Sequence, residues 1–193
     1  MTKTRLEAFS DAVIAIIMTI MVLELKVPHD SSWEALEKLW PVFLSYVVSF
    51  VMLGIYWGNH HHLVHTIKDV GAGIIWANLH LLFWLSLMPF ATAWMGENHF
   101  ERNTIIVYAL VSDLCGLAYY ILLLAIKKAN QHNPVLMDVM RKHTRKGILS
   151  FIPYTLAIPA AYIHVGISGI LIVLVALVWL IPDRNIERVV KEN

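Results

Sequence analysis

Residues 5–28 have the sequence Arg5-Leu-Glu-Ala-Phe-Ser-Asp-Ala-Val-Ile-Ala-Ile-Ile-Met-Thr-Ile-Met-Val-Leu-Glu-Leu-Lys-Val-Pro28, a mostly apolar run with an acid near its start. A bilayer core requires about 20 residues of helix, so a helix over about 5–27 is long enough to cross it. Asp11 and Glu24 make both ends of this helix polar. Ionisable groups at such positions usually face other helices rather than lipid. The stretch therefore predicts a membrane-spanning first helix that is shielded by the rest of the protein.

The composition supports a membrane protein. Of the 193 residues, 58% are hydrophobic and only 15% are charged, with a net charge of +1. Soluble domains carry about 25% charged residues. One cysteine, Cys115, excludes an intrachain disulfide framework, and the weak net charge argues against a nucleic-acid partner. An ordinary cytosolic enzyme and a secreted disulfide scaffold are both excluded.

Long gaps between charged residues mark the further spans. The interval from Lys38 to Lys68 contains no Asp, Glu, Lys or Arg, and neither does the interval from Asp69 to Glu97. The apolar run that ends at Pro182 is too long for one helix, so we expect it to form a hairpin. An all-α fold with a single transmembrane domain over residues 1–193 follows. We expect its six helices at about 5–27, 39–62, 71–95, 103–127, 143–164 and 167–182.

Basic residues predict the orientation. With both termini inside, twelve Lys and Arg lie on the inner side and only Lys26, Lys38 and Arg102 on the outer side. Cytoplasmic loops carry such an excess, so we expect a multi-pass protein of the cell membrane with cytosolic termini, in contact with membrane lipids. Residues 134–146 are basic and partly apolar, which fits an interfacial helix or a continuation of the next span. Their charge is explained by topology, with a lipid-headgroup site as the alternative.

Polar residues at the start of the first helix have two interpretations. Arg5 and Phe9 are four residues apart, so the guanidinium can lie against the ring. Asp11 requires a partner inside the membrane, and Arg5 of the same or a neighbouring chain is the natural candidate. One interpretation is a polar lock at the cytosolic end of a pore helix. The other is an ordinary helix start with Ser10 as a cap.

The aliphatic residues Ile16, Ile20 and Leu23 are spaced four and then three apart, with Thr19 beside them. This spacing is typical of core packing in a helix. If several copies of the helix surrounded an axis, the same residues would form stacked apolar rings, which can gate ions by dewetting. Spacing alone does not choose between the two.

The motif Arg5-x-x-x-Phe9-Ser10-Asp11, followed by an aliphatic run that ends at Pro28, resembles the signature of the transmembrane protein 175 family. Animal members of that family are endolysosomal potassium channels with two six-helix units per chain. A prokaryotic branch has one unit, and the resemblance extends over the whole of this chain. No second copy of the motif is present.

The resemblance implies a homotetramer in which four first helices line a central pore for potassium. Ile16, Ile20 and Leu23 would form its hydrophobic layers, and Thr19 would supply hydroxyls to the permeant ion. The Thr-Val-Gly-Tyr-Gly loop of ordinary potassium channels is absent here, as it is in the family. Ala15 stands where some members carry a serine. The resemblance implies a channel that prefers potassium to sodium and uses no cofactor and no catalytic residue.

Trp57, His61 and His65 follow one another at four-residue intervals, so they share one helix face. We expect this face to support the first-helix motif by hydrogen bonding, and the resemblance implies the same contact. Binding of zinc or pH sensing by the cluster at 60–65 are the alternatives, and our prediction for a bound metal is none. A proton- or metal-coupled transporter built on these histidines is the alternative function.

Three polar residues lie inside later spans. Asn78 is expected to hydrogen-bond across the bundle, as is His80. Asp113 is a functional candidate because acids inside a membrane usually are. The alternative for Asp113 is a hydrogen-bonded acid packed on the first or third span.

Overall fold

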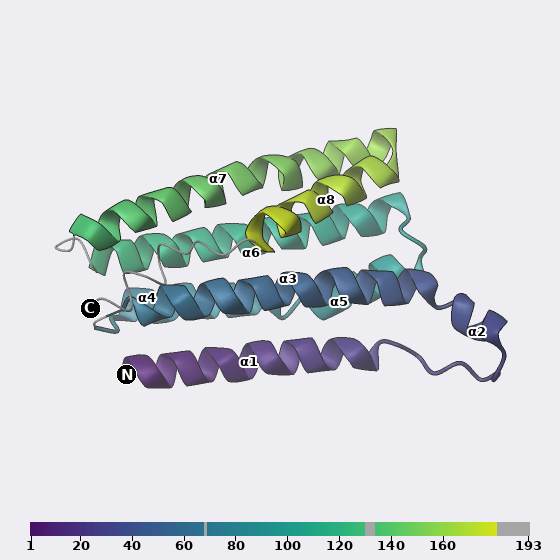
Figure 1. The fold of residues 1–193 in the computed structure, drawn as a ribbon, viewed down its shortest axis with the longest axis horizontal. Helices are drawn as coiled ribbons and strands as arrows, with labels where there is room; N and C mark the ends of the chain where they lie inside the picture. Colours follow the sequence, from purple (N-terminus) through teal and green to yellow (C-terminus); the bar gives the residue numbers. More distant parts are fainter. Residues whose placement is uncertain (68, 130–133, 181–193) are drawn as a thin grey trace.

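The computed structural model describes residues 1–67, 69–129 and 134–180. These residues form eight helices and no strand (Figure 1). The helices are α1 (Lys3–Leu23), α2 (Trp33–Glu37), α3 (Trp40–His65), α4 (Ala72–Leu85), α5 (Met88–Glu97), α6 (Arg102–Ala129), α7 (Pro134–Ile163) and α8 (Val165–Leu180).

Helix α1 begins with a side-chain cap. The Thr2 hydroxyl oxygen accepts from the Arg5 backbone N–H at 3.4 Å, which satisfies one of the free donors at the helix start. The helix ends at Leu23, four residues before the predicted end of the 5–27 segment. Proline disfavours a helical conformation at the residue before it, and Pro28 follows closely. The chain then forms the short helix α2, which we had not predicted, with Ser32 as its cap.

The segment expected as one helix over 71–95 is two helices. Helix α4 ends at Leu85 and α5 begins at Met88, with Pro89 in the first turn of α5. A proline ring clashes with the carbonyl four residues before it and offers no N–H, so the helix is interrupted just before Pro89. Proline is favoured in the first turn of the helix that follows. Pro89 was the available signal for this break.

The bounds of the other helices also differ from those predicted. Helix α3 extends the 39–62 segment to His65, and α6 occupies Arg102–Ala129 where 103–127 was expected. Helix α7 starts at Pro134 rather than at 143, so the basic stretch 134–146 continues the span. The predicted hairpin turns at His164, between α7 and α8, and residues 181–182 of the last predicted segment lie outside the described residues.

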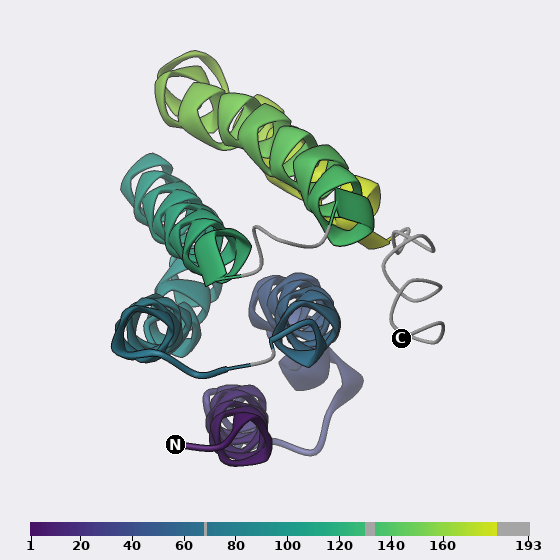
Figure 2. The same cartoon turned by 90° about the vertical axis from the view of Figure 1, so that its left-hand side faces the viewer.

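The helices form a bundle with α1 at one edge and α7 and α8 at the other (Figures 1 and 2). Helices α3, α4, α5 and α6 lie between these edges. Helix α1 packs on α3, α4 and α5, whereas α7 packs mainly on α6 and α8. One broad side of α1 therefore has no packing partner among the described residues of its own chain.

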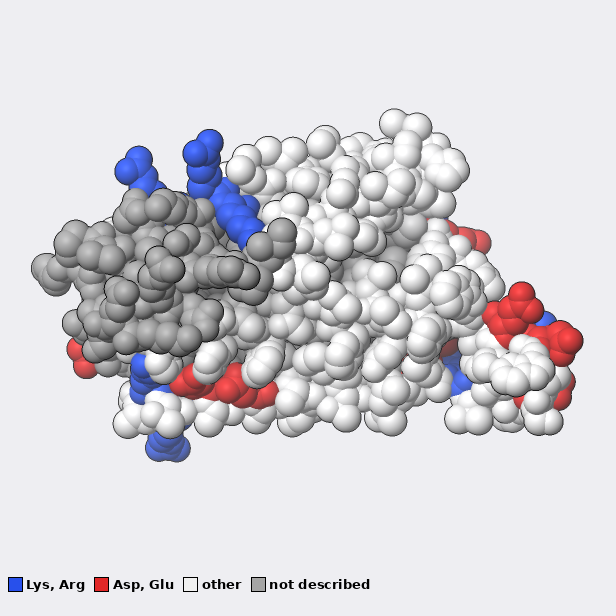
Figure 3. Space-filling model, in the orientation of Figure 1, with Lys and Arg blue, Asp and Glu red and all other residues white. Residues whose placement is uncertain are grey.

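Five segments of the described chain are long and apolar enough to cross a membrane. The third of them combines α4 and α5. Helix α8 is apolar but has only 16 residues, so a sixth span stays a prediction. On the face shown in Figure 3, charged side chains gather toward the two ends and uncharged atoms cover the region between them. The protein is an all-helical, multi-pass membrane protein.

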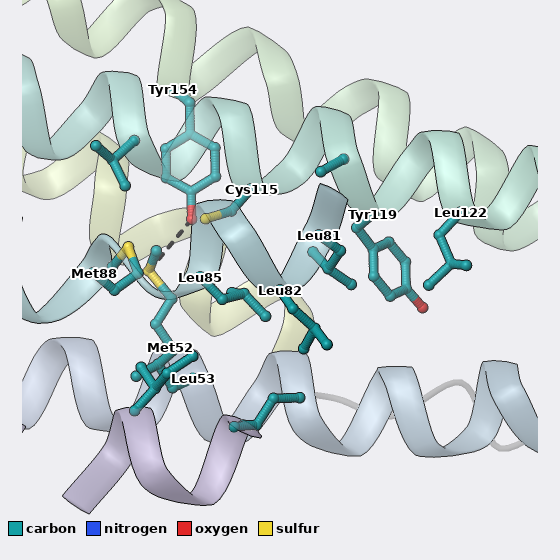
Figure 4. Close-up of a cluster of buried hydrophobic side chains, with 14 of the residues drawn as sticks. Met52, Leu53, Leu81, Leu82, Leu85, Met88, Cys115, Tyr119, Leu122 and Tyr154 are labelled. Atoms are coloured by element: carbon teal, nitrogen blue, oxygen red, sulfur yellow. Dashed lines mark hydrogen bonds between the residues drawn. The ribbon is translucent and has the colours of Figure 1, made fainter. Parts of the chain in front are cut away.

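The centre of the bundle is a buried cluster of aliphatic, sulfur-containing and tyrosine side chains (Figure 4). The Tyr154 hydroxyl of α7 points to the Met52 sulfur of α3 at 3.5 Å. Beside it, the hydroxyls of Ser49 and Tyr108 lie 2.9 Å apart, and Thr92 donates to Ser49 at 2.8 Å. These contacts connect α3, α5, α6 and α7 into one core.

Helices α3 and α5 approach each other at a glycine. A Cβ added to Gly96 would lie 2.4 Å from the Ser45 Oγ and 2.7 Å from the Val42 Cα. Only a residue without a side chain permits this separation. At Gly54 and Gly58, two α3 positions with the spacing of a close helix contact, an added Cβ would meet nothing within 4 Å. Those two glycines face away from the packing within the described chain.

Candidate functional site

The two faces of α1 are both mostly apolar but differ completely in burial. The residues that face the bundle recur at intervals of three and four and are buried: Leu6, Ser10, Ile14, Ile17 and Met21. The aliphatic residues singled out in the sequence lie on the other face. Ile16 is 58% exposed and Leu23 is 75% exposed, and Ile20, Thr19 and Phe9 are exposed with them. We call Phe9, Ile16, Thr19, Ile20 and Leu23 the outward stripe.

The hydroxyl of Thr19 bonds to its own helix. Its Oγ1 donates to the Ala15 carbonyl at 2.5 Å. Because the proton is used in this bond, the oxygen keeps its lone pairs as acceptors, and Thr19 is exposed on the same face as the stripe. Beside the stripe, a groove separates α1 from α5, and Ile16, Ile20, Phe90 and Trp94 are among its lining residues.

Asp11 bonds to α3 rather than to Arg5. The Trp57 indole Nε1 donates to the Asp11 Oδ1 at 3.0 Å. Within the described parts of the chain, Arg5 forms no ion pair with Asp11 and does not stack on Phe9, and its side chain is exposed. The expectation of a partner from the same chain's Arg5 is therefore wrong. The neutral indole N–H of Trp57 gives the Asp11 carboxylate a hydrogen-bond donor, so no second charged side chain is needed beside it.

Ser10 is the centre of a buried hydrogen-bond chain that the sequence did not reveal. Its Oγ donates to the Leu6 carbonyl at 2.8 Å and accepts from the Asn78 Nδ2 of α4 at 2.9 Å. The Asn78 Oδ1 in turn lies 2.7 Å from the His60 Nε2 of α3. Since an amide oxygen only accepts, the His60 Nε2 carries the proton. The chain Ser10–Asn78–His60 connects three helices. The alternative of Ser10 as a helix cap is wrong, because α1 begins at Lys3 with Thr2 as its cap and Ser10 lies inside the helix.

The histidine face of α3 lies against the first half of α1. The His61 Nδ1 lies 2.9 Å from a Glu7 carboxylate oxygen, and the Lys3 Nζ donates to the His65 backbone carbonyl at 2.7 Å. The ring centroid of His61 is 6.5 Å from that of Trp57 and 6.0 Å from that of His65. Glu7 was not among the predicted residues. Its spacing of four from Asp11 was the available signal, because it places both acids on one helix face.

Two polar residues of the later spans also find partners. His80 accepts from the Trp84 indole of its own helix at 2.9 Å, and among the described residues it has no hydrogen bond across the bundle. Asp113 accepts from the Thr155 hydroxyl of α7 at 3.2 Å. The hydrogen bond of Asp113 is thus made to α7, which was not among the expected partners.

The other end of α1 is held by an ion pair. Lys26, just after the helix, contacts the Glu97 carboxylate at the end of α5. This hydrogen-bonded carboxylate raises the pKa of Lys26 above its usual value. Both ends of α1 are thus attached to the bundle by polar contacts, while its middle contributes only apolar packing.

The fold and the site together define a class of protein. It is a multi-pass helical membrane protein with a peripheral N-terminal helix, and that helix buries one apolar face and presents another. Polar contacts hold the presented helix in one orientation at both ends. This arrangement suits a helix whose exposed face contacts something outside its own chain.

Comparison with known proteins identifies the family. The family model described as the endosomal/lysosomal potassium channel TMEM175 matches residues 5–89, which extend from α1 into α5. A protein named potassium channel from a Chryseobacterium species is 50% identical over 194 residues, which cover all of both chains. A protein named potassium channel from Chamaesiphon minutus is 29% identical over 90% of this chain and 93% of its own length.

A solved structure agrees with the fold. The crystal structure of a lysosomal potassium-selective channel TMEM175 homolog from Chamaesiphon minutus has a TM-score of 0.80 and 26% identity, and covers 92% of this chain and 96% of that chain. The human endosomal/lysosomal proton channel TMEM175 is 34% identical over 43% of this chain, which corresponds to 19% of the human protein. The chain belongs to the TMEM175 family, a family of ion channels and not of enzymes, and both predictions are confirmed.

Proposed function

We propose that four copies of this chain form a potassium-selective channel of the cell membrane, with α1 of each copy lining a central pore. Potassium is the permeant ion, and no cofactor takes part. The names of the bacterial relatives and of the matched structure support potassium as the ion. The chain lacks the Thr-Val-Gly-Tyr-Gly loop, so selectivity depends on other residues.

The observation that carries the proposal is the outward stripe. Ile16, Ile20 and Leu23 are exposed on a helix at the edge of the bundle, and polar contacts at both helix ends keep them facing outward. In a tetramer these residues form three successive apolar layers around the axis. An ion loses water in such layers without gaining ligands, which gives a hydrophobic constriction.

Thr19 gives the constriction its preference for cations. Its proton is committed to the Ala15 carbonyl, so the oxygen presents lone pairs to the axis. Four such oxygens attract a partly dehydrated cation and repel an anion. The groove between α1 and α5 receives the neighbouring copy, which covers Phe90 and the edges of the stripe.

Both termini are cytosolic in this proposal. The start of α1, with Lys3 and Arg5, lies at the same end of the bundle as the start of α7 (Figure 1). Arg141 and Arg145 of α7 are at that end as well. Basic residues gather on the cytosolic side of membrane proteins. The C-terminus itself lies outside the described residues.

The test is ion flux from the purified protein in liposomes, with a potassium gradient compared against a sodium gradient. The wild type passes potassium faster than sodium. The substitution Leu23→Ala widens one apolar layer, so it raises the flux of both ions and lowers the ratio of potassium to sodium. Leu177→Ala of α8 is the matched control, because Leu177 is also exposed but lies far from the stripe in sequence.

Three results would overturn the proposal. The first is the absence of potassium flux from intact tetramers, whose state is checked by mass measurement in detergent. The second is a flux that Leu23→Ala leaves unchanged, which would mean that α1 does not line the pore. The third is an equal change from Leu177→Ala, which would indicate a general effect on the bundle.

A further inference from the structure

The sequence predicts no bound metal, but the structure brings together a ligand set that the sequence did not indicate. We propose that Glu7, Asp11 and His61 form a binding site for a transition-metal dication of the zinc type, at the N-terminal end of α1. One ligand atom from each of the three side chains lies within 4.8 Å of the other two. Two of the ligands come from α1 and the third from α3. The site goes beyond ion permeation, and its binding does not depend on the proposed function.

The geometry brings the ligands together without a metal. The His61 Nδ1 is already 2.9 Å from a Glu7 oxygen. Ligand atoms at about 2.0 to 2.2 Å from a tetrahedral zinc are about 3.3 Å apart, so small side-chain rotations suffice to close the triangle. Asp11 uses one oxygen to accept from Trp57 and keeps the other for the metal. The indole N–H then orients the ligand carboxylate, as outer partners do in metal sites.

The chemistry of the three groups favours a borderline transition metal. Two carboxylates and an imidazole combine hard oxygen ligands with a nitrogen ligand, whereas magnesium and calcium sites use oxygen alone. Two negative charges offset the dication. Three protein ligands leave one position for water, so the metal exchanges with solution.

The site is accessible and distinct from its histidine neighbours. The side chain of His61 is 45% exposed and that of Glu7 is 18% exposed, so an ion can reach both. His60 faces the buried bond to Asn78 instead. His65 lies one turn further along α3, with its ring 6.0 Å from that of His61, and does not belong to the group of three.

Metal binding would connect α1 to α3. At this end the polar contacts between the two helices include the Lys3–His65, His61–Glu7 and Trp57–Asp11 bonds. A bound metal replaces the weak His61–Glu7 pair with coordinate bonds and so restrains α1. An effect of zinc on ion flux would follow from this restraint, and that consequence alone rests on the proposed function.

The experiment is calorimetric titration of Zn²⁺ into the full-length protein in detergent, without a histidine tag, and without any flux measurement. We expect one site per chain. Glu7→Gln and His61→Gln each remove one ligand and weaken binding at least about tenfold, whereas His65→Gln leaves it unchanged. No zinc binding by the wild type, or equal binding by all variants, would overturn the proposal. Loss of binding in His65→Gln would assign the zinc to a histidine pair instead.

A second measurement needs no variant. The X-ray absorption spectrum of the zinc-loaded wild type reports how many imidazoles coordinate the metal. One imidazole among oxygen ligands supports the site. Two or more imidazoles would overturn it, because the exposed histidines at 61–65 would then be the ligands.

Discussion

The two faces of α1 have nearly the same amino-acid composition and opposite surroundings. Ile14 is fully buried against the bundle, while Ile16, two positions further along the same helix, is 58% exposed. Both are isoleucines within the same apolar run. The difference lies in which of them meets α3, α4 and α5. In a membrane, lipid accepts either side chain equally, so hydrophobicity does not set the rotation of this helix about its axis.

Polar residues set the rotation instead. Ser10 on the inner face bonds to Asn78, and Asp11 at the edge of that face bonds to Trp57. An unpaired polar group in the membrane costs free energy, so only one rotation of α1 satisfies both. The outward stripe is the apolar surface that remains. The comparison of the two faces can be tested by substitutions on each.

The largest effect on stability is expected from Ile14→Ala. Ile14 is fully buried, and its truncation leaves a cavity that lowers the free energy of unfolding by about 2 kcal/mol. Ile16→Ala, the matched change on the exposed face, should alter it by less than about 0.5 kcal/mol. Denaturation by SDS in mixed micelles, followed by circular dichroism, measures both. Equal losses would mean that the two faces are equally packed.

A smaller loss is expected from Ser10→Ala, which removes the acceptor of the Asn78 amide. A buried N–H is then left without its partner, and the free energy of unfolding falls by about 1.5 kcal/mol. Ser86→Ala is the control, because among the described residues the Ser86 hydroxyl bonds only to the Phe83 carbonyl of the helix that it ends. The same micelle assay applies. If Ser86→Ala were as costly as Ser10→Ala, the connection from α1 to α4 would not be what stabilises the inner face.

The smallest loss is expected from Trp57→Phe, which keeps an aromatic ring but removes the donor to Asp11. Trp57 is half exposed, and hydrogen bonds between membrane helices contribute about 0.6 kcal/mol on average. A loss of that size is expected by SDS denaturation. Trp76→Phe, an exposed tryptophan of α4, is the control and should have no effect. If Trp57→Phe also left the free energy of unfolding unchanged, the bond to Asp11 would not help to orient α1, and Ser10 alone would do so.

Much of the fold was predictable because the bilayer imposes it. Long runs with few charges predicted spans, and five segments of the described chain are long and apolar enough to be spans. The motif around Asp11 indicated the family. The interruption before Pro89 was not predicted, because a hydropathy pattern marks where lipid begins rather than where backbone hydrogen bonds stop. For residues 134–146 the sequence left an interfacial helix and a continuation of the next span open, and the structure shows the continuation. The Trp57 face was expected to hydrogen-bond to the first-helix motif, but Arg5 of the same chain was wrongly offered as the partner of Asp11. Trp57 lies 46 positions from Asp11 in the chain, and only packing shows that these two side chains are the ones that meet.

The sequence by itself determined the class of the protein, its apolar segments and the residues that carry the family motif. Each of these follows from local composition or from short spacing along one helix. The tertiary structure decided which face of α1 is inward, which buried groups Ser10 and Asp11 contact, and that Glu7 meets His61. These contacts join α1 to α3 and α4. Which face of a helix is buried depends on the helices packed around it. In lipid, polar contacts and steric fit determine that packing, because hydrophobicity does not distinguish the two faces.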